Sequence, residues 1–427
     1  MIELKEFRGI WFLPSTPNVE IAGILNYEPG VLMNLELIGD LRNRTQFHEY
    51  FDESDPVSVI HGFTTVGIKM SLFGCRESFS VKDGAIPSVK YSCDSFIEGM
   101  YLEDREQPLF DRIECNFPQL LRWLGKSAFR MTREMVHAKF YNTNIHYSPD
   151  DKFFASYSLE EGFDLEFSVS AIARNSHYNC LVENLPSASI FHSNGALSLW
   201  ELIKQMNILR SFLSLGLLQT VPFVYIKLYF AASDNNVSYT YLDRGEKYIA
   251  KDKSFLFNFS RIETHLPLLL RNWWKDTENI FPVRMHLLEA IVPKTSFRST
   301  DFLVLTFAIE GFYHRFLKAS KSSKGNLTSA LKDILRIFKD LSFIKTISIK
   351  PDEVNDSRNY YAHLYSDEPQ KKINSGVELL ILSEKLKLLL ILLILKQMGF
   401  ENTDLEHCMS HSDLFSSIDT FNKMPKA

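Results

Sequence analysis

The pattern of hydrophobic and polar positions changes its period part-way along the chain. Up to about residue 180, short aliphatic or β-branched runs end at turn residues, as in 19–25, 31–37, 67–73, 140–145 and 163–169. The last run alternates apolar and polar residues with a period of two, which is typical of a half-buried strand. Glu160-Glu161-Gly162, just before it, indicates a solvated hairpin turn. We therefore predict a β-rich region with sandwich-like packing.

A helical period first appears between residues 197 and 218. Apolar residues recur there at helical spacing, which predicts one amphipathic helix. A strand-like run at 223–230 follows, and the mixed-charge segment 243–253 indicates a connection. We place the main boundary near residue 255. Residues 1–255 then form the β-rich region, with room for two subdomains, and residues 256–427 form a second domain.

Beyond residue 255 nearly every segment has a helical period. The candidate helices span 260–276, 282–291, 300–319, 327–341, 352–364 and 373–398. Asn326 can cap one of them, and Pro351 and Pro369 bracket the segment 352–364. Residues 256–427 are therefore predicted to be an all-α helical bundle. The predicted fold class of the whole chain is α+β multidomain.

Composition and charge limit the classes of function. The chain has 427 residues, of which 45% are hydrophobic and 23% charged, so we expect folded domains rather than disorder. Its net charge is −5, with 47 basic and 52 acidic residues. This balance excludes binding of nucleic acid through a global positive field. Any contact with nucleic acid must be local.

Cysteine usage and hydropathy indicate in which cellular compartment the protein is expected. An odd count of five cysteines without a CxxC pair is typical of a reducing environment. The amino-terminal sequence lacks the apolar run of a signal peptide. The most apolar run, 388–395, has eight residues, whereas a membrane span needs about 20. We therefore expect a cytoplasmic protein that does not enter a membrane.

No metal ion or cofactor is expected. His407, Cys408 and His411 cluster near the C-terminal end, but their spacing fits no standard zinc site. We expect a polar C-terminal tail there.

One short sequence carries candidate chemistry. In Arg358-Asn359-Tyr360-Tyr361-Ala362-His363, a polar residue directly follows the arginine and a histidine comes five positions after it. The looser spacing also fits Arg42 with His48 and Arg130 with His137, so spacing alone selects no site. Only the third pair combines the polar residue with a helix in the predicted bundle.

These residue types could cleave RNA without a metal ion. Histidine titrates near neutral pH and suits transfer of the 2′-hydroxyl proton, whereas arginine stays charged and can grip two phosphate oxygens. Asn359 would orient the histidine or a phosphate oxygen. At about 100° per residue, Asn359 and His363 lie roughly 40° apart on the helix, and Arg358 and His363 roughly 140° apart. Arg358 must therefore bend toward the histidine or meet one across a twofold dimer. The alternative is a surface helix on which Arg358 pairs with Asp352 or Asp356.

A basic stretch precedes this motif. Residues 315–350 contain nine basic and two acidic side chains, a local excess of seven positive charges. Lys318, Lys321 and Lys324 are candidate contacts to an RNA backbone, and solvated helix faces are the alternative. Glu310, before this stretch, is a candidate partner of Arg358 from a neighbouring helix.

Two parts of the sequence resemble a known family. The motif at 358–363, within a C-terminal helical bundle, is similar to the active motif of the HEPN ribonucleases. Gly9-Ile10-Trp11-Phe12-Leu13-Pro14, the run 19–25 with Gly23, and Leu35-Glu36-Leu37-Ile38-Gly39 resemble the N-terminal domain of ApeA-type bacterial abortive-infection proteins. Those proteins join a β-rich N-terminal domain to a C-terminal HEPN domain, the order predicted above.

The resemblance implies an anti-phage defence protein that cleaves RNA and causes abortive infection. It assigns catalysis to Arg358 and His363, with Asn359 in the polar position, without a metal ion or cofactor. It also implies a homodimer or higher homo-oligomer formed through the helical domain. The substrate would be RNA, with tRNA as one candidate, and the β-rich region would sense an unidentified phage-derived trigger or restrain the nuclease.

Two other functions stay open. The helical domain could be a non-catalytic HEPN module that binds RNA or a partner protein. Alternatively, the β-rich region could bind a small molecule or carbohydrate, with a purely structural helical part.

Overall fold

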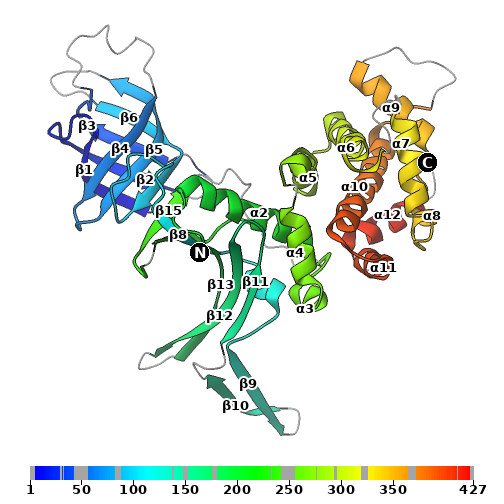
Figure 1. Cartoon of the computed structure of the whole chain (residues 1–427), viewed down its shortest axis with the longest axis horizontal. Coiled ribbons are helices and arrows are strands. Elements are labelled where there is room, and N and C mark those ends of the chain that lie inside the picture. The colour runs from blue at the N-terminus through cyan, green and yellow to red at the C-terminus, as the bar shows by residue number, and fades with distance from the viewer. Residues whose placement is uncertain are drawn as a thin grey trace. The chain divides into compact units, whose positions relative to one another are not determined.

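The chain forms two compact units, each described here by itself. A computed structural model describes residues 5–28, 31, 33–42, 56–81, 88–136, 139–147, 152–175, 180–231, 233–241, 255–275, 277–292, 296–318, 326–363, 372–410 and 412–423. The first unit comprises Met1–Arg122, Lys126–Asn207 and Pro222–Ala250, and the second Trp123–Gly125, Ile208–Val221 and Lys251–Ala427. The strands belong to the N-terminal part of the chain and most helices to the C-terminal part (Figure 1). The predicted α+β multidomain class is confirmed.

Part of the β-rich unit closes into a barrel. The strands are antiparallel and pair around the barrel in the order β5-β4-β1-β2-β3-β6, and β6 pairs back to β5. Their bounds are β1 Lys5–Phe12, β2 Ile21–Tyr27, β3 Met33–Ile38, β4 Val57–Thr64, β5 Lys69–Val81 and β6 Ser88–Cys93. The sequence predicted sandwich-like packing, whereas the strands form a continuous sheet with one closed end. The long strand β5 makes this possible because it pairs with β4 on one edge and with β6 on the other.

The barrel core explains the N-terminal motif. Trp11 is completely buried together with Leu25, Leu35 and other aliphatic side chains. Its ring lies against Gly62, where a Cβ atom would come within 2.2 Å of the indole carbons. Because an interior cannot absorb such an overlap, the bulky indole requires a glycine on the neighbouring strand.

The rest of the sheet extends from the edge of β5 opposite β4, where β7 pairs with the first half of β5 and β6 with the second half. In pairing order it consists of β7 Ser95–Glu98, β15 Asn236–Tyr241, β14 Tyr225–Phe230, β8 Phe110–Asn116, β13 Cys180–His192, β12 Phe163–Asn175 and β11 Phe153–Ser158. A separate hairpin pairs β9 Phe129–Val136 with β10 Lys139–Tyr147. Glu161 and Gly162 adopt positive φ values of 60° and 80° between β11 and β12. The hairpin turn predicted there is confirmed.

Two helices interrupt the strands. Helix α1 spans Leu120–Leu124, and α2 spans Leu199–Leu217. On α2, Leu199, Leu202 and Met206 are buried at helical spacing, which confirms the predicted amphipathic helix. The Cys115 sulfur of β8 lies 3.0 Å from that of Met206, so this part of α2 packs on the buried face of the sheet.

The second unit is helical. Its helices are α3 Phe259–Ile262, α4 Leu266–Trp274, α5 Thr277–Ile291, α6 Ser299–Phe312, α7 Leu327–Ile337, α8 Ile344–Ile347, α9 Pro351–His363, α10 Gly376–Met398, α11 Asn402–Ser410 and α12 Asp413–Lys423, with a π-helical turn η3 at Tyr313–Leu317. Asn326 Oδ1 accepts a hydrogen bond from Ser329 N at 3.0 Å, so the predicted cap of α7 is confirmed. Within the described ranges, none of these helices combines the length and apolar character that crossing a membrane requires.

The C-terminal segment differs from the prediction. The prediction of a polar tail around residue 407 is wrong, because α11 and α12 occupy this part of the chain. Leu405, Cys408 and Met409 are buried at helical spacing, a short apolar stripe that the polar composition hides. Burial raises the pKa of the Cys408 thiol to about 11, as in a structural cysteine. His411 lies outside the described residues.

Candidate active site

Helix α9 carries the arginine–histidine motif and begins as its sequence predicts. Pro351 stands at its first position, and Asp352 and Glu353 lie in the first turn, where the helix dipole favours negative charge. Only Val354 and Ser357 are fully buried. Since α9 packs against α6 and α7 along this narrow face, most of its polar residues stay accessible.

A small polar network fixes α9 against the segment that leads into α10. The Ser357 hydroxyl is completely buried and accepts hydrogen bonds from Asn374 N at 3.0 Å and Asn374 Nδ2 at 3.2 Å. One turn further, Tyr361 donates its hydroxyl hydrogen to the Asn374 carbonyl at 3.1 Å. The Tyr361 ring also packs edge-on against Phe302 of α6, with 6.3 Å between the centroids. These contacts therefore fix the position of the next residue, Arg358, relative to α6.

Arg358 reaches across to α6. Its Nη2 lies 3.8 Å from Glu310 Oε2, and both side chains are 24% exposed. The guanidinium carbon lies 5.7 Å from the centroid of the Phe307 ring, and Nη1 donates to Asn359 Oδ1 at 3.0 Å. Among the described residues, Arg358 Nε is buried and has no hydrogen-bond acceptor. The predicted contact with Glu310 is confirmed.

Asn359 and His363 complete the motif. Asn359 is half-buried and accepts from Arg358, so its amide orients the guanidinium. His363 lies in the last turn of α9 and is exposed. The motif thus presents a held cation and, one turn and a half along the helix, an accessible imidazole.

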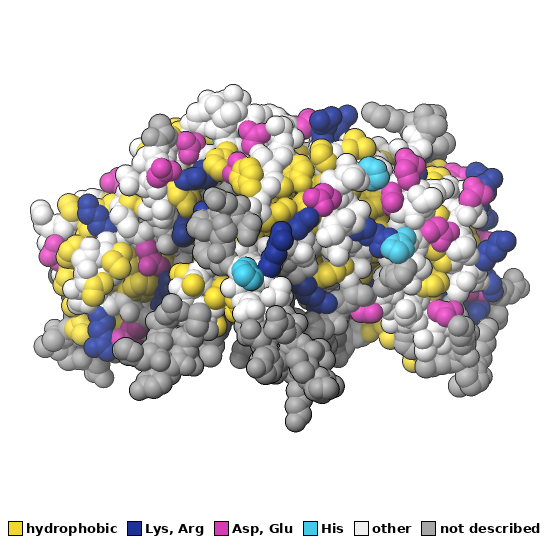
Figure 2. All heavy atoms as spheres, turned by 90° about the horizontal axis from the view of Figure 1, so that it is seen from below, with side chains coloured by type: hydrophobic (Ala, Val, Ile, Leu, Met, Phe, Trp, Pro, Cys, Tyr) yellow, Lys and Arg dark blue, Asp and Glu magenta, His cyan; other side chains and the backbone are white. Residues whose placement is uncertain are grey.

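Acidic residues accompany the basic stretch before the motif. Lys332 Nζ lies 3.6 Å from Asp352 Oδ1, and Arg336 Nη1 lies 2.9 Å from Asp333 Oδ1. Lys318 follows η3 and is half-buried, while Lys321 and Lys324 lie outside the described residues. Basic and acidic side chains are also interspersed on the face that Figure 2 shows. The local positive excess is therefore partly neutralised by neighbouring carboxylates.

Sequence reasoning missed the contacts that hold the arginine. Three of these contacts involve side chains that neither titrate near neutral pH nor belong to the motif, so the sequence pattern gave no reason to select them: Phe307, Ser357 and Asn374. One signal was present for Ser357, since it lies three residues after Val354 and four before Tyr361 on one helix face. A small polar residue on a buried stripe needs a partner, and Asn374 is that partner.

The other arginine–histidine pairs lie in the β-rich unit. Arg42 follows β3 and Arg130 lies in β9. His48 and His137 lie outside the described residues. Neither arginine lies in a helix.

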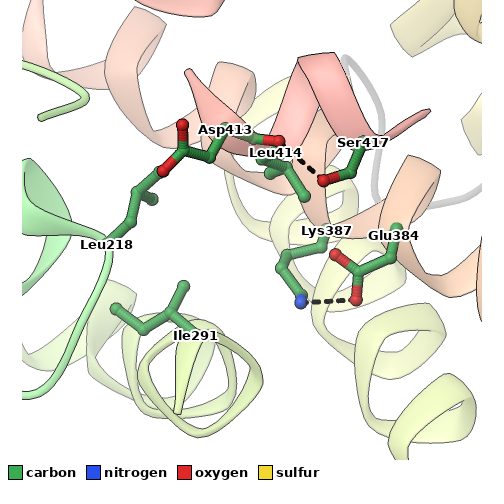
Figure 3. A pocket seen from close by; sticks show the side chains of 7 residues that line it. All are labelled: Leu218, Ile291, Glu384, Lys387, Asp413, Leu414 and Ser417. Carbon is green, nitrogen blue, oxygen red and sulfur yellow. Dashed lines mark hydrogen bonds and ion pairs between the residues drawn. The ribbon is translucent and has the colours of Figure 1, made fainter. Parts of the chain in front are cut away.

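Two cavities lie in the helical unit away from the motif. One of about 180 Å³ is lined by Leu218, Ile291, Glu384, Lys387, Asp413, Leu414 and Ser417 (Figure 3). Lys387 Nζ lies 2.7 Å from Glu384 Oε1 in its wall. The other, of about 260 Å³, is formed by residues of α5, α6 and α10. In the part of the chain that the structure describes, no group of three or more His, Cys, Asp or Glu side chains is placed to hold a metal ion.

Two family models match the chain. ApeA N-terminal domain 1 matches residues 6–273, more than half of the chain, and Apea-like HEPN matches residues 296–404. The chain belongs to the ApeA family. The HEPN match includes Glu310, Arg358 and His363, so the motif described above lies inside the HEPN region of this ApeA protein. No curated protein and no solved structure gives a significant match.

Family membership gives the function its coarse outline. HEPN domains are typically ribonucleases and commonly dimerise, and the ApeA family is associated with anti-phage defence. The resemblance that the sequence showed is thereby confirmed.

Proposed function

We propose that this ApeA protein is a metal-independent endoribonuclease whose activity causes abortive infection. The observation that carries the proposal is the setting of Arg358, a guanidinium held beside Glu310, Phe307 and Asn359. It lies in the same helix as an exposed imidazole, that of His363. RNA cleavage needs these two functions, a fixed cation for the phosphate and a group that carries protons.

Each residue has a role in the proposed reaction. His363 accepts the proton of the ribose 2′-hydroxyl, whose oxygen attacks phosphorus. Arg358 binds phosphate oxygens and stabilises the charge that develops there, and Asn359 orients its guanidinium. The products are a 2′,3′-cyclic phosphate and a free 5′-hydroxyl. Because Arg358 and His363 lie roughly 140° apart on the helix, two copies of α9 around a twofold axis would bring both groups to one phosphate.

The Arg358–Glu310 ion pair suits a positioning role for Glu310. A partly exposed pair of this kind contributes only about 0–1 kcal/mol to stability. Phosphate oxygens offer the guanidinium charge-assisted, bidentate hydrogen bonds, which are stronger. Glu310 thus orients Arg358 before RNA binds, and the substrate can displace it.

The remaining parts of the proposal concern substrate and control. Lys318, Lys321 and Lys324 contact the RNA backbone, and tRNA is one candidate substrate. Residues 1–255 sense a phage-derived trigger or restrain the nuclease, which acts in the cytoplasm as a homodimer or larger homo-oligomer. A permanently active ribonuclease would destroy the host's own RNA, so a restraint is needed.

RNA cleavage by the full chain in EDTA tests this proposal. Wild type should cut RNA and leave cyclic phosphate ends, whereas His363→Ala should lower the rate by about 10²–10⁴-fold. His407→Ala is the matched control, since His407 is an exposed histidine on α11 of the same unit. Undiminished cleavage by His363→Ala would remove the proposal.

The second candidate function is a non-catalytic module that binds RNA or a partner protein. The ion pair of Arg358 with Glu310 favours it, since an arginine engaged in this way can be purely structural. In that case RNA binding survives His363→Ala but weakens when Lys318, Lys321 and Lys324 are all changed to Gln.

A further inference from the structure

The π-helical turn η3 follows α6 directly and presents a second histidine. His314 is its second residue and is exposed. The neighbouring Tyr313 is buried and donates its hydroxyl hydrogen to Asp333 Oδ2 of α7 at 2.7 Å. The Tyr313 and His314 rings meet edge-on, with centroids 5.7 Å apart. This turn is therefore anchored, and π-helical turns of this kind often occur at functional sites.

His314 continues the face of α6 that holds Arg358. At about 100° per residue, Phe307 and Glu310 lie roughly 60° apart around the axis of α6, and His314, the second residue of the π-helical turn, follows about one turn after Glu310. The first two residues contact the Arg358 side chain. His314 lies one turn further along this face, about 6 Å from Glu310 in the axial direction.

The contacts between α6 and α9 show on which side of Arg358 each histidine lies. Tyr361 contacts Phe302, whereas Arg358 contacts Phe307 and Glu310. The two helices therefore run antiparallel where they meet. Moving along α9 from Arg358 to His363 leads toward the start of α6, and His314 lies in the opposite direction. Along the helix axes, His363 and His314 therefore lie on opposite sides of Arg358.

This arrangement fits a requirement of the proposed reaction. Cleavage by the 2′-hydroxyl is an in-line displacement, in which the attacking and leaving oxygens lie on opposite sides of phosphorus. The base that takes the first proton and the acid that supplies the second must therefore lie on opposite sides of the bound phosphate. Arg358 marks the position of that phosphate.

We propose that His314 is the general acid of the reaction, an inference that rests on the proposed ribonuclease function. His363 removes the 2′-hydroxyl proton while the 2′-oxygen forms its bond to phosphorus. The bond from phosphorus to the 5′-oxygen breaks, and the His314 imidazolium gives its proton to that oxygen. Exchange of protons with water then returns both imidazoles to their starting states.

Two substrates distinguish an acid from a structural residue. When RNA is cleaved, the leaving 5′-oxygen is an alkoxide that needs a proton. A uridine 3′-(p-nitrophenyl phosphate) instead releases a stable phenolate, which needs none. His314→Ala should lower RNA cleavage by about 10²–10⁴-fold and cleavage of the nitrophenyl ester by less than about 10-fold. His363→Ala should impair both substrates, and His407→Ala neither.

A second variant and a pH profile distinguish the loss of a general acid from misfolding. His314→Gln should unfold at the wild-type temperature and repeat the loss on RNA, and both His314 variants should lose the fall in rate at high pH. Equal loss on both substrates, or RNA cleavage at the wild-type rate, would overturn the role of His314 alone. Failure of wild type to cleave RNA in EDTA, both alone and with an extract of phage-infected cells that supplies the trigger, would instead overturn the proposed function on which it rests.

Discussion

Helices α9 and α10 follow each other in the chain but are held in place in different ways. All residues from 388 to 395 on α10 are buried, so burial on every side fixes this helix. On α9 only Val354 and Ser357 are buried. Hydrogen bonds from Asn374 and the ion pair with Glu310 help to hold this helix in place. The comparison teaches that the proposed catalytic residues lie on a helix that contributes few buried side chains to the core. Such a helix can present a guanidinium and an amide that are only partly buried, and an imidazole that is exposed.

Removing the arginine should separate activity from stability most strongly. Arg358→Ala should lower RNA cleavage by at least about 10²-fold, since a preorganised cation at the phosphate is lost. The free energy of unfolding should change by less than about 1 kcal/mol, because the pair with Glu310 is partly exposed. Cleavage rates and urea unfolding of the same preparations measure both effects.

Arg336→Ala is the matched control for this variant, since Arg336 forms an exposed ion pair on α7. A drop in stability of several kcal/mol in Arg358→Ala would mean that α9 is a core element after all, and the comparison would fail.

Truncating the core of α10 should have the reverse outcome. Leu390 is completely buried, so Leu390→Ala should lower the free energy of unfolding by about 2–5 kcal/mol. Cleavage per folded molecule should stay at the wild-type level. Val377→Ala, at an exposed site on the same helix, should unfold like wild type.

Ser357 tests the polar fixing of α9. Ser357→Ala leaves the buried Asn374 donors without their acceptor and should cost about 1–3 kcal/mol. Because Arg358 follows directly, cleavage should also fall, by less than in Arg358→Ala. Ser410→Ala, on the exposed surface of α11, should change neither quantity. Unchanged stability of Ser357→Ala would show that this network does not hold the helix.

The smallest effect concerns Glu353 in the first turn of α9. Burial alone would raise its pKa, but the hydrogen bond from Lys350 and the charge of Lys372 outweigh this and lower the pKa below the ordinary value of 4.5. The stabilisation is therefore present above pH 4.5 and is lost as the pH falls through the lowered pKa. Glu353→Gln should be less stable than wild type at pH 7 by about 0.2–1 kcal/mol, the range of exposed ion pairs. The difference should vanish in acid, and a gap that persists at pH 3 would contradict it.

The same contrast explains how much could be predicted from the sequence. Local periodicity predicts α2, α9 and α10 well, since each signal lies within one helix. It misses α11, whose apolar stripe has only a few members. It also cannot show that β6 pairs with β3 and closes the barrel, because these two strands lie far apart in the sequence. For the candidate site, the Glu310 contact was predicted from charge, whereas Phe307 and Asn374 act through packing and hydrogen bonding that only the fold creates.

Strand β5 has a consequence for attempts to dissect the molecule. Its first half pairs with β7 and its second half with β6, so the barrel and the open sheet share one strand. A fragment that ends after Cys93 would leave the carbonyls of Lys69 and Phe73, and the backbone groups of Ser71 between them, without hydrogen-bond partners on one edge. Such an edge invites pairing with other chains. A fragment meant to test the proposed sensing role should therefore keep β7 and the strands beyond it, since a shorter fragment is expected to aggregate.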